Sequence, residues 1–527
     1  MSTTHPILIA GSWAEDPSSE TFSATNPATG EKLEGAYPVS SRQTLERMAR
    51  CSAEAASELN TLDPQRVAAF LDSHASLIDE RRKSIAEMAH LETGLEISPR
   101  LMESEMDRTI DQLRQAAGCV RSGEWVSARI DTDKNLRSMY EPLGGGVLTI
   151  GPNNFPLAYN AIAGGDFAAA IAARNPIIAK GHPLHPATTR LLAECAHEAA
   201  KSTGMPDGTV QMFYHCSPED GLTLIRMPEI SAFGFTGSQK AGLAMKKAAD
   251  ETGTPAYLEL SSINPMFLMP GAVGTRGGDI AQSIADSMLA ASGQQCTCPG
   301  LIVLSESEES EAMIARLTQH LSEAEPHVML SHDGVDSLHD AVLHNIEQGA
   351  ERIIGGNPMP GDAARYEHTL LRVSASRFLE NHQELQTEMF GVAALLVVCD
   401  IDDQFVEVAR KLEGNLTGTI HHDGSEQDRA LHAQLVRELR LRVGRLIHNG
   451  VPTGVSVNAA TVHGGPYPAT GHPGFTAVGM PTAIHRFAAL RCYDQVDEWA
   501  LPPELRDKNP TGTMLRYVDQ EWTTRDA

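Results

Sequence analysis

The residues best suited to covalent chemistry lie in the segment Gly293-Gln-Gln-Cys-Thr-Cys-Pro-Gly300. A predicted amphipathic helix precedes this segment and a predicted strand follows it, so both thiols would lie on a loop between rigid elements, where reactive groups are common. A partly ionised thiol is a good nucleophile, and an aldehyde carbonyl is a good electrophile for it. Most free cysteines are buried packing residues, so composition alone does not select Cys296 from the eight cysteines of the chain. Cys298 either forms a strained, reversible bond with Cys296 or is a small packing side chain near it.

The elements that would position this loop follow a pattern of alternating strands and helices. From residue 147 onward, short apolar strands alternate with amphipathic helices, which predicts an α/β fold with a parallel sheet. The predicted strands are 147–150, 177–180, 209–213, 231–235 and 256–260, and the predicted helices are 160–173, 187–201, 219–226 and 238–250. A second series begins after a glycine-rich boundary at 270–278 and comprises a helix at 276–291, a strand at 301–304 and a helix at 309–322.

Two further segments have an informative composition. Apolar residues recur at helical spacing between about residues 41 and 120, which predicts a helical region. Residues 451–481 are rich in Gly, Pro and Thr and cannot form a regular helix. Because long irregular segments inside compact proteins are usually functional, we predict an ordered loop that lines a site.

Length, charge and cysteine content limit the class of protein. A chain of 527 residues is too long for one hydrophobic core, so two or three domains are expected. Its formal net charge of -26 would repel nucleic acid and anionic membranes, which favours a small-molecule partner. The cysteines include no pair with zinc spacing and suit a reducing compartment, so we predict no metal site. Neither a signal peptide nor an apolar run of membrane-spanning length is recognisable, and we therefore predict a cytoplasmic location.

Two strand ends are candidates for binding a dinucleotide, since ligands of doubly wound sheets lie beyond the carboxyl ends of the strands. Phe235-Thr-Gly-Ser238 joins a predicted strand to a predicted helix and could hold a pyrophosphate, although it is not GxGxxG and an ordinary βα turn would look the same. At the end of the second strand, Lys180 precedes Gly181, His182 and Pro183 and offers positive charge without a nearby carboxylate. This pattern favours the 2′-phosphate of NADP, and a solvated surface lysine is the alternative.

Five ordered blocks of the sequence resemble the aldehyde dehydrogenase superfamily. They are Pro152-Asn-Asn-Phe-Pro156, Phe235-Thr-Gly-Ser238, Tyr257-Leu-Glu-Leu-Ser-Ser-Ile-Asn-Pro265, Gly293-Gln-Gln-Cys-Thr297 and Glu388-Met-Phe-Gly391. The resemblance extends over nearly the whole chain, from Leu8-Ile-Ala-Gly-Ser-Trp13 to Val518-Asp-Gln-Glu-Trp522. It implies an NAD(P)-dependent oxidation of an aldehyde to a carboxylic acid, through a thiohemiacetal and a thioester on Cys296.

The resemblance also implies roles for individual residues. Cys296 would be the nucleophile, Glu259 the general base for thioester hydrolysis, and Asn154 an oxyanion donor through its side-chain amide. On the cofactor side, the resemblance implies contacts by Lys180, Gly237, Ser238, Glu388 and Phe390, to which the charge argument adds His182. Members that prefer NAD usually carry a glutamate three positions after the lysine, where this chain has Pro183. We therefore predict NADP as the cofactor and leave the use of NAD open.

Three units of structure are implied by the same resemblance. A Rossmann-type dinucleotide-binding domain would comprise residues 1–125 and 142–262, and an α/β catalytic domain with the cysteine nucleophile would comprise residues 263–484. A small oligomerisation hairpin and strand would comprise residues 126–141 and 485–527. This last unit predicts a homodimer or a homotetramer.

Other segments resemble the branch of the family that oxidises 2-oxoglutarate semialdehyde (2,5-dioxovalerate). They are Glu105-Met-Asp-Arg-Thr-Ile-Asp-Gln-Leu-Arg114, Asn449-Gly-Val-Pro-Thr-Gly-Val455, Val462-His-Gly-Gly-Pro-Tyr-Pro-Ala-Thr470 and Leu501-Pro-Pro-Glu-Leu-Arg-Asp-Lys-Asn-Pro-Thr-Gly512. A keto-acid substrate needs a cationic anchor opposite its aldehyde, and arginine suits a carboxylate. Arg108 and Arg114 lie six residues apart on a predicted helix, so at most one would face the substrate. We predict Arg108 for this role, with Phe155 as a further contact, and a surface salt bridge is the alternative.

Three other interpretations of function stay open. The same branch is also similar to medium- and long-chain fatty aldehyde dehydrogenases, whose substrate tunnel would be apolar. A cysteine esterase or hydrolase would need a histidine within hydrogen-bond reach of the thiol, and would not need Lys180 or the turn at Gly237. A noncatalytic homologue would have no need of the set Cys296, Glu259 and Asn154.

Overall fold

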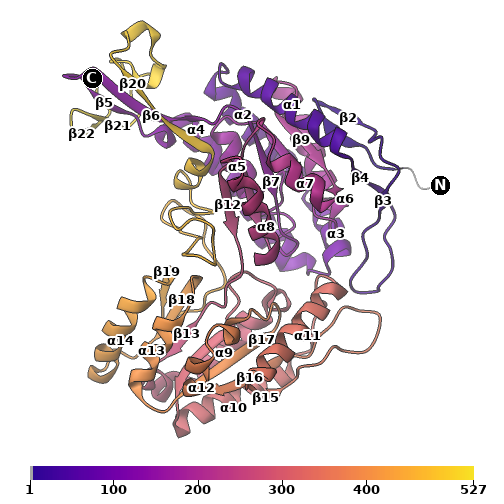
Figure 1. The fold of residues 1–527 in the computed structure, drawn as a ribbon, viewed down its shortest axis with the longest axis vertical. Coiled ribbons are helices and arrows are strands. Elements are labelled where there is room, and N and C mark those ends of the chain that lie inside the picture. Colours follow the sequence, from indigo (N-terminus) through magenta and orange to yellow (C-terminus); the bar gives the residue numbers. More distant parts are fainter. Residues whose placement is uncertain (1–3) are drawn as a thin grey trace.

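The computed structural model describes residues 4–527 and, within them, every side chain except that of Gln427. Two large α/β units lie one above the other in Figure 1, and a small sheet projects from the upper unit. Both large units contain a mostly parallel sheet, which confirms the predicted α/β class. No helix in the described part of the chain is long and apolar enough to cross a membrane.

The sheet of the upper unit has seven strands in the order β12-β11-β7-β8-β9-β1-β2. Its parallel strands are β7 (Gly146–Ile150), β8 (Ile177–Lys180), β9 (Val210–Phe213), β11 (Ile230–Thr236) and β12 (Ala256–Glu259), and β1 (Ile7–Ile9) and β2 (Ser12–Ala14) extend it antiparallel. The five predicted strands are therefore confirmed to within about one residue at each end. Because the strand order runs in opposite directions on the two sides of β7, the carboxyl ends of β7 and β11 define a switch point, where ligands of such sheets bind.

The helices between these strands also follow the prediction, with one difference. They are α5 (Gly165–Ala172), α6 (Pro186–Thr203), α7 (Pro218–Ile225) and α8 (Gln239–Asp250). Helix α5 begins at Gly165 rather than at residue 160, because Asn160 forms a local turn instead. The Nδ2 atom of Asn160 donates to the carbonyl oxygen of Pro156 at 2.9 Å, and Oδ1 accepts from the N–H of Ile162 at 3.1 Å.

Four long helices fill the predicted helical region and pack on the same core as the first sheet. They are α1 (Arg42–Leu59), α2 (Pro64–Glu80), α3 (Arg82–Thr93) and α4 (Met106–Ser122), with the π-helical segment η1 (Ile97–Glu105) between α3 and α4. A small sheet beside them consists of β3 (Thr21–Phe22), β4 (Tyr37–Ser40) and β10 (His215–Cys216). The segment η1 and helix α4 are important below, because their side chains line the candidate active site.

The lower unit has a second seven-stranded sheet, in the order β15-β16-β17-β14-β13-β18-β19. Its strands are β13 (Met266–Leu268), β14 (Leu301–Ser305), β15 (Glu351–Ile354), β16 (Thr369–Ser374), β17 (Ala393–Cys399), β18 (Asn415–His421) and β19 (Val443–His448), and only β15 is antiparallel to its neighbour. The helices are α9 (Pro270–Leu289), α10 (Glu308–Glu323), α11 (His332–Glu347), α12 (Ala375–Glu380), α13 (Asp402–Lys411) and α14 (Glu426–Leu439). Apolar clusters cover both faces of this sheet.

The helix predicted at 276–291 begins earlier than expected and includes most of the glycine-rich segment at 270–278. Helix α9 already begins at Pro270, and only Arg276 within the segment departs from helical backbone angles, with φ −138°. Two of its glycines face α10, since a Cβ atom on Gly277 would contact Cβ of Met313 at 3.5 Å and one on Gly278 would meet the end of the Arg316 side chain. Packing against a neighbouring helix therefore overrides the low helix propensity of glycine here.

The projecting sheet combines strands from two distant parts of the chain. Its order is β20-β6-β5-β21-β22, with β5 (Arg129–Asp131), β6 (Leu136–Pro142), β20 (Ala488–Asp494), β21 (Arg516–Val518) and β22 (Glu521–Thr523). Short 3-10 turns are η2 (Glu124–Val126), η3 (Ala290–Gly293), η4 (Glu384–Gln386), η5 (Thr482–Phe487), η6 (Glu498–Ala500) and η7 (Pro503–Leu505). Residues 449–481 contain no regular helix or strand, in agreement with the predicted loop. The predicted domain boundaries stay predictions.

Candidate active site

The loop that carries Cys296 has an unusual backbone that a neighbouring segment explains. Ala291, Ser292 and Gly293 have φ angles of 51°, 54° and 69°, in the left-handed region. At Gly293 a side chain is also excluded sterically, because a Cβ atom would lie 2.2 Å from the carbonyl carbon of Gly391. The turn before Cys296 is thus packed directly against the backbone that follows Glu388.

The side chain of Asn264 holds the nucleophile loop from the other side. Its Nδ2 atom donates to the carbonyl oxygens of Cys296 and Cys298, at 2.9 Å in both cases. Its Oδ1 atom accepts from the hydroxyls of Ser262 and Thr417, at 2.9 and 3.0 Å. The Asn264 amide thereby links β18 and the segment after β12 to the loop that carries Cys296. Its contact with Cys298 involves only the backbone of that residue.

Glu259 lies at the carboxyl end of β12, where the long loop joins the strand. The N–H of Leu260 donates to the carbonyl of Ala469 at 2.8 Å, and the N–H of Gly471 donates to the carbonyl of Leu258 at 3.0 Å. These two bonds fix the loop beside Glu259. His463 reaches the carboxylate from the same loop, and both side chains are almost completely buried.

Cys296, His463 and Glu259 form a chain of contacts. Nε2 of His463 lies 2.8 Å from Oε1 of Glu259 and 3.5 Å from Sγ of Cys296. Burial and the negative charge of Glu259 hold the pKa of the Cys296 thiol well above its ordinary value. Burial also tends to raise the pKa of Glu259, but contacts with His463, Cys296 and Arg108 outweigh it and lower that pKa. The arrangement therefore couples a protonated thiol to an ionised carboxylate and a histidine.

His463 was missed as a functional residue by the sequence analysis. The segment Val462–Thr470 was used only as a sign of the branch, although a histidine within a glycine- and proline-rich loop was the available signal. Its position also removes one criterion against a cysteine hydrolase, because a histidine does lie within hydrogen-bond reach of the thiol. The choice between a cysteine hydrolase and an aldehyde dehydrogenase therefore depends on the strand ends that are predicted to bind a dinucleotide and on the comparison with known proteins.

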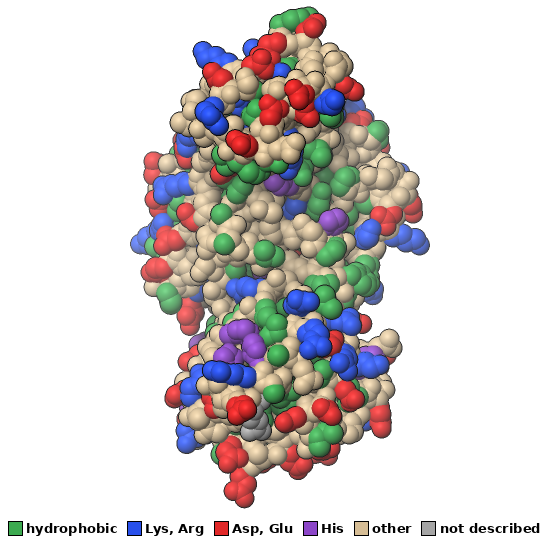
Figure 2. Space-filling view, turned by 90° about the vertical axis from the view of Figure 1, so that its left-hand side faces the viewer, with side chains coloured by type: hydrophobic (Ala, Val, Ile, Leu, Met, Phe, Trp, Pro, Cys, Tyr) green, Lys and Arg blue, Asp and Glu red, His purple; other side chains and the backbone are tan. Residues whose placement is uncertain are grey.

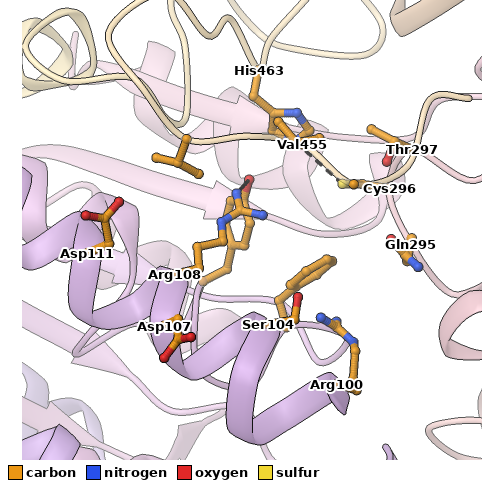
Figure 3. Close-up of a pocket in the computed structure, with 14 residues that line it drawn as sticks. Arg100, Ser104, Asp107, Arg108, Asp111, Gln295, Cys296, Thr297, Val455 and His463 are labelled. Atoms are coloured by element: carbon orange, nitrogen blue, oxygen red, sulfur yellow. Dashed lines mark hydrogen bonds between the residues drawn. The ribbon is translucent and has the colours of Figure 1, made fainter. Parts of the chain in front are cut away.

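A cavity of about 370 Å³ opens in front of the thiol. Its lining includes Cys296, His463, Phe155, Tyr159, Arg100 and Arg108, with Gly454, Val455 and Val457 from the long loop. In Figure 3 the side chains of Arg108 and His463 point toward the space in front of Cys296. The cavity is thus partly aromatic and carries two guanidinium groups. Two carboxylates, Asp107 and Asp111, also line it, but they are exposed and bonded to Arg82 and Gln115. The guanidinium groups therefore suit a small anionic substrate better than a long alkyl chain.

The two guanidinium groups have different partners. Arg100 forms an ion pair with the buried carboxylate of Glu105 at 3.0 Å and stacks on the ring of Phe155, 4.3 Å from its centroid. Arg108 donates from Nη2 to the hydroxyl of Tyr159 at 2.9 Å, and its buried Nε atom has no hydrogen-bond partner among the described residues. Arg114 is exposed and does not line the cavity. Of the three, Arg108 has the most free hydrogen-bonding capacity toward the cavity.

Asn154 lies beside the cavity rather than in its lining. It is 5% exposed, and its Nδ2 atom donates to the carbonyl of Gln294 at 3.0 Å. A primary amide has two N–H donors, so one of them is used to hold the segment that leads to Cys296. The predicted oxyanion role would rest on the second donor.

Lys180 and His182 lie together at the carboxyl end of β8. The Nζ atom of Lys180 donates to the carbonyl of Gly181 at 3.2 Å. Burial lowers the pKa of Lys180, and among the described residues only Cys216 opposes that shift. Burial and the nearby His185, Lys180 and His215 hold the pKa of His182 well below its ordinary value. A partly buried ammonium group without a carboxylate partner fits a bound anion.

The other predicted cofactor residues come from two segments. Gly237 and Ser238 lie at the start of α8, and Glu388 and Phe390 lie just before β17. The N–H of Gly237 donates to the carbonyl of Glu259 at 3.1 Å, and Ser238 caps α8 by accepting from the N–H of Ala241 at 3.4 Å. Glu388 lines a second cavity, of about 380 Å³, which also includes Gln239 of α8. Burial raises the pKa of Glu388 to about 7. Phe390 is half-buried and precedes the glycine that packs against the nucleophile loop.

Cys298 has the surroundings of a packing residue. Its Sγ atom contacts only the carbonyl of Gly391, at 3.9 Å, within the described residues, and it is half-buried against the core of the second sheet. Burial and Glu388 raise the pKa of its thiol to about 12. Unlike Cys296, whose thiol lies 3.5 Å from Nε2 of His463, Cys298 has only a backbone carbonyl as hydrogen-bond partner among the described residues, and a carbonyl cannot take its proton.

Comparison with known proteins agrees with this geometry. The profile described as "Aldehyde dehydrogenase family" matches residues 13–472. Alpha-ketoglutaric semialdehyde dehydrogenase 2 of Azospirillum brasilense is 34% identical over 97% of this chain and 98% of its own length, and alpha-ketoglutaric semialdehyde dehydrogenase of Acinetobacter baylyi is 35% identical over 85% of both. Among solved structures, a lactaldehyde dehydrogenase has a TM-score of 0.81, with 21% identity over 94% of this chain and 99% of that one. A 3,6-anhydro-L-galactose dehydrogenase in complex with NAP has a TM-score of 0.79, with 19% identity over 93% and 99%.

The chain therefore belongs to the aldehyde dehydrogenase family. It is an NAD(P)-dependent enzyme that oxidises an aldehyde, and its Rossmann-like parallel sheet confirms the predicted fold class.

Proposed function

We propose that this enzyme oxidises 2-oxoglutarate semialdehyde to 2-oxoglutarate with NADP. The observation that carries the substrate assignment is the guanidinium of Arg108 in the cavity, which is hydrogen-bonded to the Tyr159 hydroxyl and forms no ion pair among the described residues, whereas Arg100 is paired with Glu105. The two relatives named as alpha-ketoglutaric semialdehyde dehydrogenases, which match this chain at 34% and 35% identity, support the same substrate. A carboxylate on the substrate would pair with this group and satisfy it.

Cys296 attacks the aldehyde carbon after losing its proton to the pair formed by His463 and Glu259. Nε2 of His463 lies 3.5 Å from the thiol and 2.8 Å from the carboxylate, so the proton that this nitrogen donates to Oε1 of Glu259 passes to the carboxylate as Nε2 accepts the thiol proton. Attack converts the carbonyl oxygen to an alkoxide, which the second N–H of the Asn154 amide and the backbone N–H of Cys296 would stabilise. A bound nicotinamide, which Glu388 and Phe390 would hold, would supply the acceptor for the hydride that the tetrahedral carbon loses. The result is a thioester on Cys296.

Glu259 is the base for hydrolysis of that thioester. Its Oε1 atom is occupied by His463, while Oε2 is buried and has no hydrogen-bond partner in the described part of the chain. A water molecule bound to Oε2 would satisfy this acceptor and would lie beside Cys296. After the proton taken from the thiol has left to solvent, Glu259 accepts a proton from this water, and the hydroxide attacks the thioester carbon. Collapse of the adduct breaks the C–S bond and releases the acid, and the leaving thiolate regains its proton from Glu259.

The substrate anchor can be tested at Arg108. Replacing Arg108 with leucine should lower kcat/KM for 2-oxoglutarate semialdehyde by about 10- to 100-fold, because a hydrogen bond between charged groups contributes about 1.5–3 kcal/mol. Pentanal, which lacks the keto-acid group, should lose less than about threefold. Arg114→Leu, at an exposed position on the same helix, is the matched control. Equal losses with both aldehydes would mean that Arg108 supports the active site without contacting the carboxylate.

The cofactor assignment can be tested at Lys180. Since no carboxylate partners this ammonium group in the described structure, Lys180→Ala should raise KM for NADP at least about tenfold and KM for NAD less than about threefold. The measurement is initial rate against cofactor concentration at saturating aldehyde. The exposed Lys240, on α8, provides a control substitution. A similar rise in both Michaelis constants would refute recognition of the 2′-phosphate.

We also propose that the enzyme is a homodimer or homotetramer associated through the projecting sheet. Several large apolar side chains near this sheet are exposed, with exposed fractions of 59% for Leu490, 40% for Leu136 and 55% for Trp522. They are distributed over strands β20, β6 and β22, and several exposed large apolar side chains on so small a sheet are typical of an interface. Light scattering coupled to size exclusion should give two or four times the chain mass of 56.7 kDa. Asp substitution of Leu490 should lower that mass, and an unchanged monomeric mass in the parent protein would contradict the proposal.

One assay tests the proposed reaction as a whole. Purified protein is mixed with 2-oxoglutarate semialdehyde or with decanal, in the presence of NADP or NAD, and the absorbance of the reduced nicotinamide is followed. The proposal predicts the highest kcat/KM for the semialdehyde with NADP. Turnover of decanal without turnover of the semialdehyde would overturn the substrate assignment and would favour a fatty aldehyde dehydrogenase.

A further inference from the structure

Three histidines converge on the surface of the lower unit, away from the active site. His422 follows β18, His432 lies on α14 and His448 ends β19. Each offers a ring nitrogen, and these three atoms lie within 4.8 Å of one another. Figure 2 shows histidine side chains gathered on this face of the lower unit, in purple, at the solvent boundary. We refer to these residues as the three-histidine cluster.

The spacing within the three-histidine cluster matches that of ligands around one metal ion. Nε2 of His432 lies 3.2 Å from Nε2 of His448. Zinc–nitrogen bonds of about 2.0–2.1 Å at tetrahedral angles separate the ligand atoms by about 3.3 Å and the ring centres by about 5 Å. The observed distances between ring centroids are 4.9, 5.5 and 4.8 Å.

The orientation of the three rings also suits a tetrahedral centre. The planes of the rings are inclined at 66°, 85° and 63° to one another, so the rings do not stack and their edges converge. Imidazole nitrogen is a preferred ligand of Zn²⁺, whereas Mg²⁺ and Ca²⁺ prefer oxygen. A square-planar arrangement, which Cu²⁺ and Ni²⁺ favour, would require the ligand atoms to share a plane with the ion.

The backbone around the cluster is held by contacts that leave the rings free. Oδ1 of Asn449 accepts from the N–H of His422 at 2.9 Å and from Nη2 of Arg276 at the same distance. The nearest buried carboxylate, Asp428, is already used, because its oxygens accept from the N–H groups of Gly271 and Asp423 at 3.1 and 2.9 Å. A fourth ligand would therefore be water, which reaches the exposed side of the cluster.

We infer that His422, His432 and His448 bind one divalent transition-metal ion, with Zn²⁺ as the best fit and water as the fourth ligand. The ion would join the ends of β18 and β19 to α14. Because β19 leads directly into the loop that carries Gly454 and Val455, a bound ion would also fix the start of the loop that lines the active-site cavity. Its expected role is structural, since the cavity itself does not include these histidines.

A test must separate this site from the active site, because Glu259, Cys296 and His463 form a second group within 4.8 Å. Full-length Cys296→Ala protein, stripped with a chelator, is titrated with Zn²⁺ by isothermal calorimetry. We expect one ion per chain. His432→Ala in the same background should weaken binding by about 100-fold or more, since changes in the partners that merely orient a ligand already cost 10- to 100-fold. The exposed His332, on α11, provides the control substitution.

Cobalt spectroscopy gives an independent readout on the parent protein. Co²⁺ bound by imidazoles and water should give visible d–d absorption without a thiolate charge-transfer band, and His448→Ala should abolish it while circular dichroism and aldehyde oxidation are retained. Absence of zinc binding in the Cys296→Ala protein would overturn the inference, and would leave an N–H···N hydrogen bond between His432 and His448 as the explanation of their contact. Unchanged binding in both histidine variants would overturn it equally, whereas a thiolate band lost in Cys296→Ala would only show that the active-site group binds a second ion.

Discussion

Replacing Cys296 with alanine is expected to lower kcat for aldehyde oxidation by about 10⁴- to 10⁶-fold, the range that follows removal of a catalytic nucleophile. The physical reason is that no other thiol can form the thioester. Cys298 does not line the cavity, and its Sγ atom lies near the carbonyl of Gly391 rather than beside His463. The measurement is the formation of reduced nicotinamide at saturating 2-oxoglutarate semialdehyde.

The matched control for this loss is Cys298→Ala. Asn264 binds the carbonyl oxygens of residues 296 and 298, and these contacts do not depend on the Cys298 side chain. Cys298→Ala should therefore keep kcat within about tenfold of the parent enzyme. Cofactor affinity, measured by fluorescence titration, should change less than about twofold in both variants. Full activity in Cys296→Ala would refute the covalent mechanism, and loss of activity in both variants would point to a shared structural role of the two thiols.

The second large effect is expected for Glu259→Gln. This substitution keeps the shape of the side chain but removes the base that activates water, so steady-state kcat should fall by about 10²- to 10⁴-fold. Acylation should persist, because His463 lies 3.5 Å from the thiol and can still take its proton. Rapid mixing should then show a burst of about one equivalent of reduced cofactor per active site, followed by slow turnover.

Glu388→Gln is the control for the loss of a buried carboxyl near the thiol. Burial raises the pKa of Glu388 to about 7, but this residue lies in the second cavity and is not bonded to His463. The Glu388→Gln variant should show no burst of reduced cofactor, and its kcat should fall less than that of Glu259→Gln. If Glu259→Gln also lacks a burst, its carboxylate is needed for attack by Cys296 rather than for hydrolysis of the thioester.

The sequence predicted the framework of the site because the framework has strong local patterns. Parallel strands buried on both faces are short apolar runs, and the strands that end at Lys180 and Glu259 were located to within about one residue. Helix α5 was misplaced because the Asn160 side chain makes a turn that apolar spacing does not reveal. The first turns of α9 were not predicted, because glycine has a low helix propensity and the packing of this segment on α10 is invisible in the sequence.

The side chains that complete the site were harder to predict because they come from distant parts of the chain. His463 and Glu259 are separated by 204 residues, and His463 lies in a loop with no periodicity. Arg100 belongs to the π-helical segment η1, a conformation for which the sequence has no simple signal. The proposed metal site was hard to predict for the same reason. His432 and His448 are 16 residues apart on different elements and form no spacing motif.

The most direct test of the account is to identify the covalent intermediate. Glu259→Gln protein is mixed with 2-oxoglutarate semialdehyde and NADP, quenched in acid and digested, and the peptides are analysed by mass spectrometry. The account predicts a mass increase equal to a 2-oxoglutaryl thioester on the peptide that contains Cys296, localised to that residue and absent from Cys296→Ala protein. An adduct on another residue, or turnover of the semialdehyde without any adduct at Cys296, would contradict it.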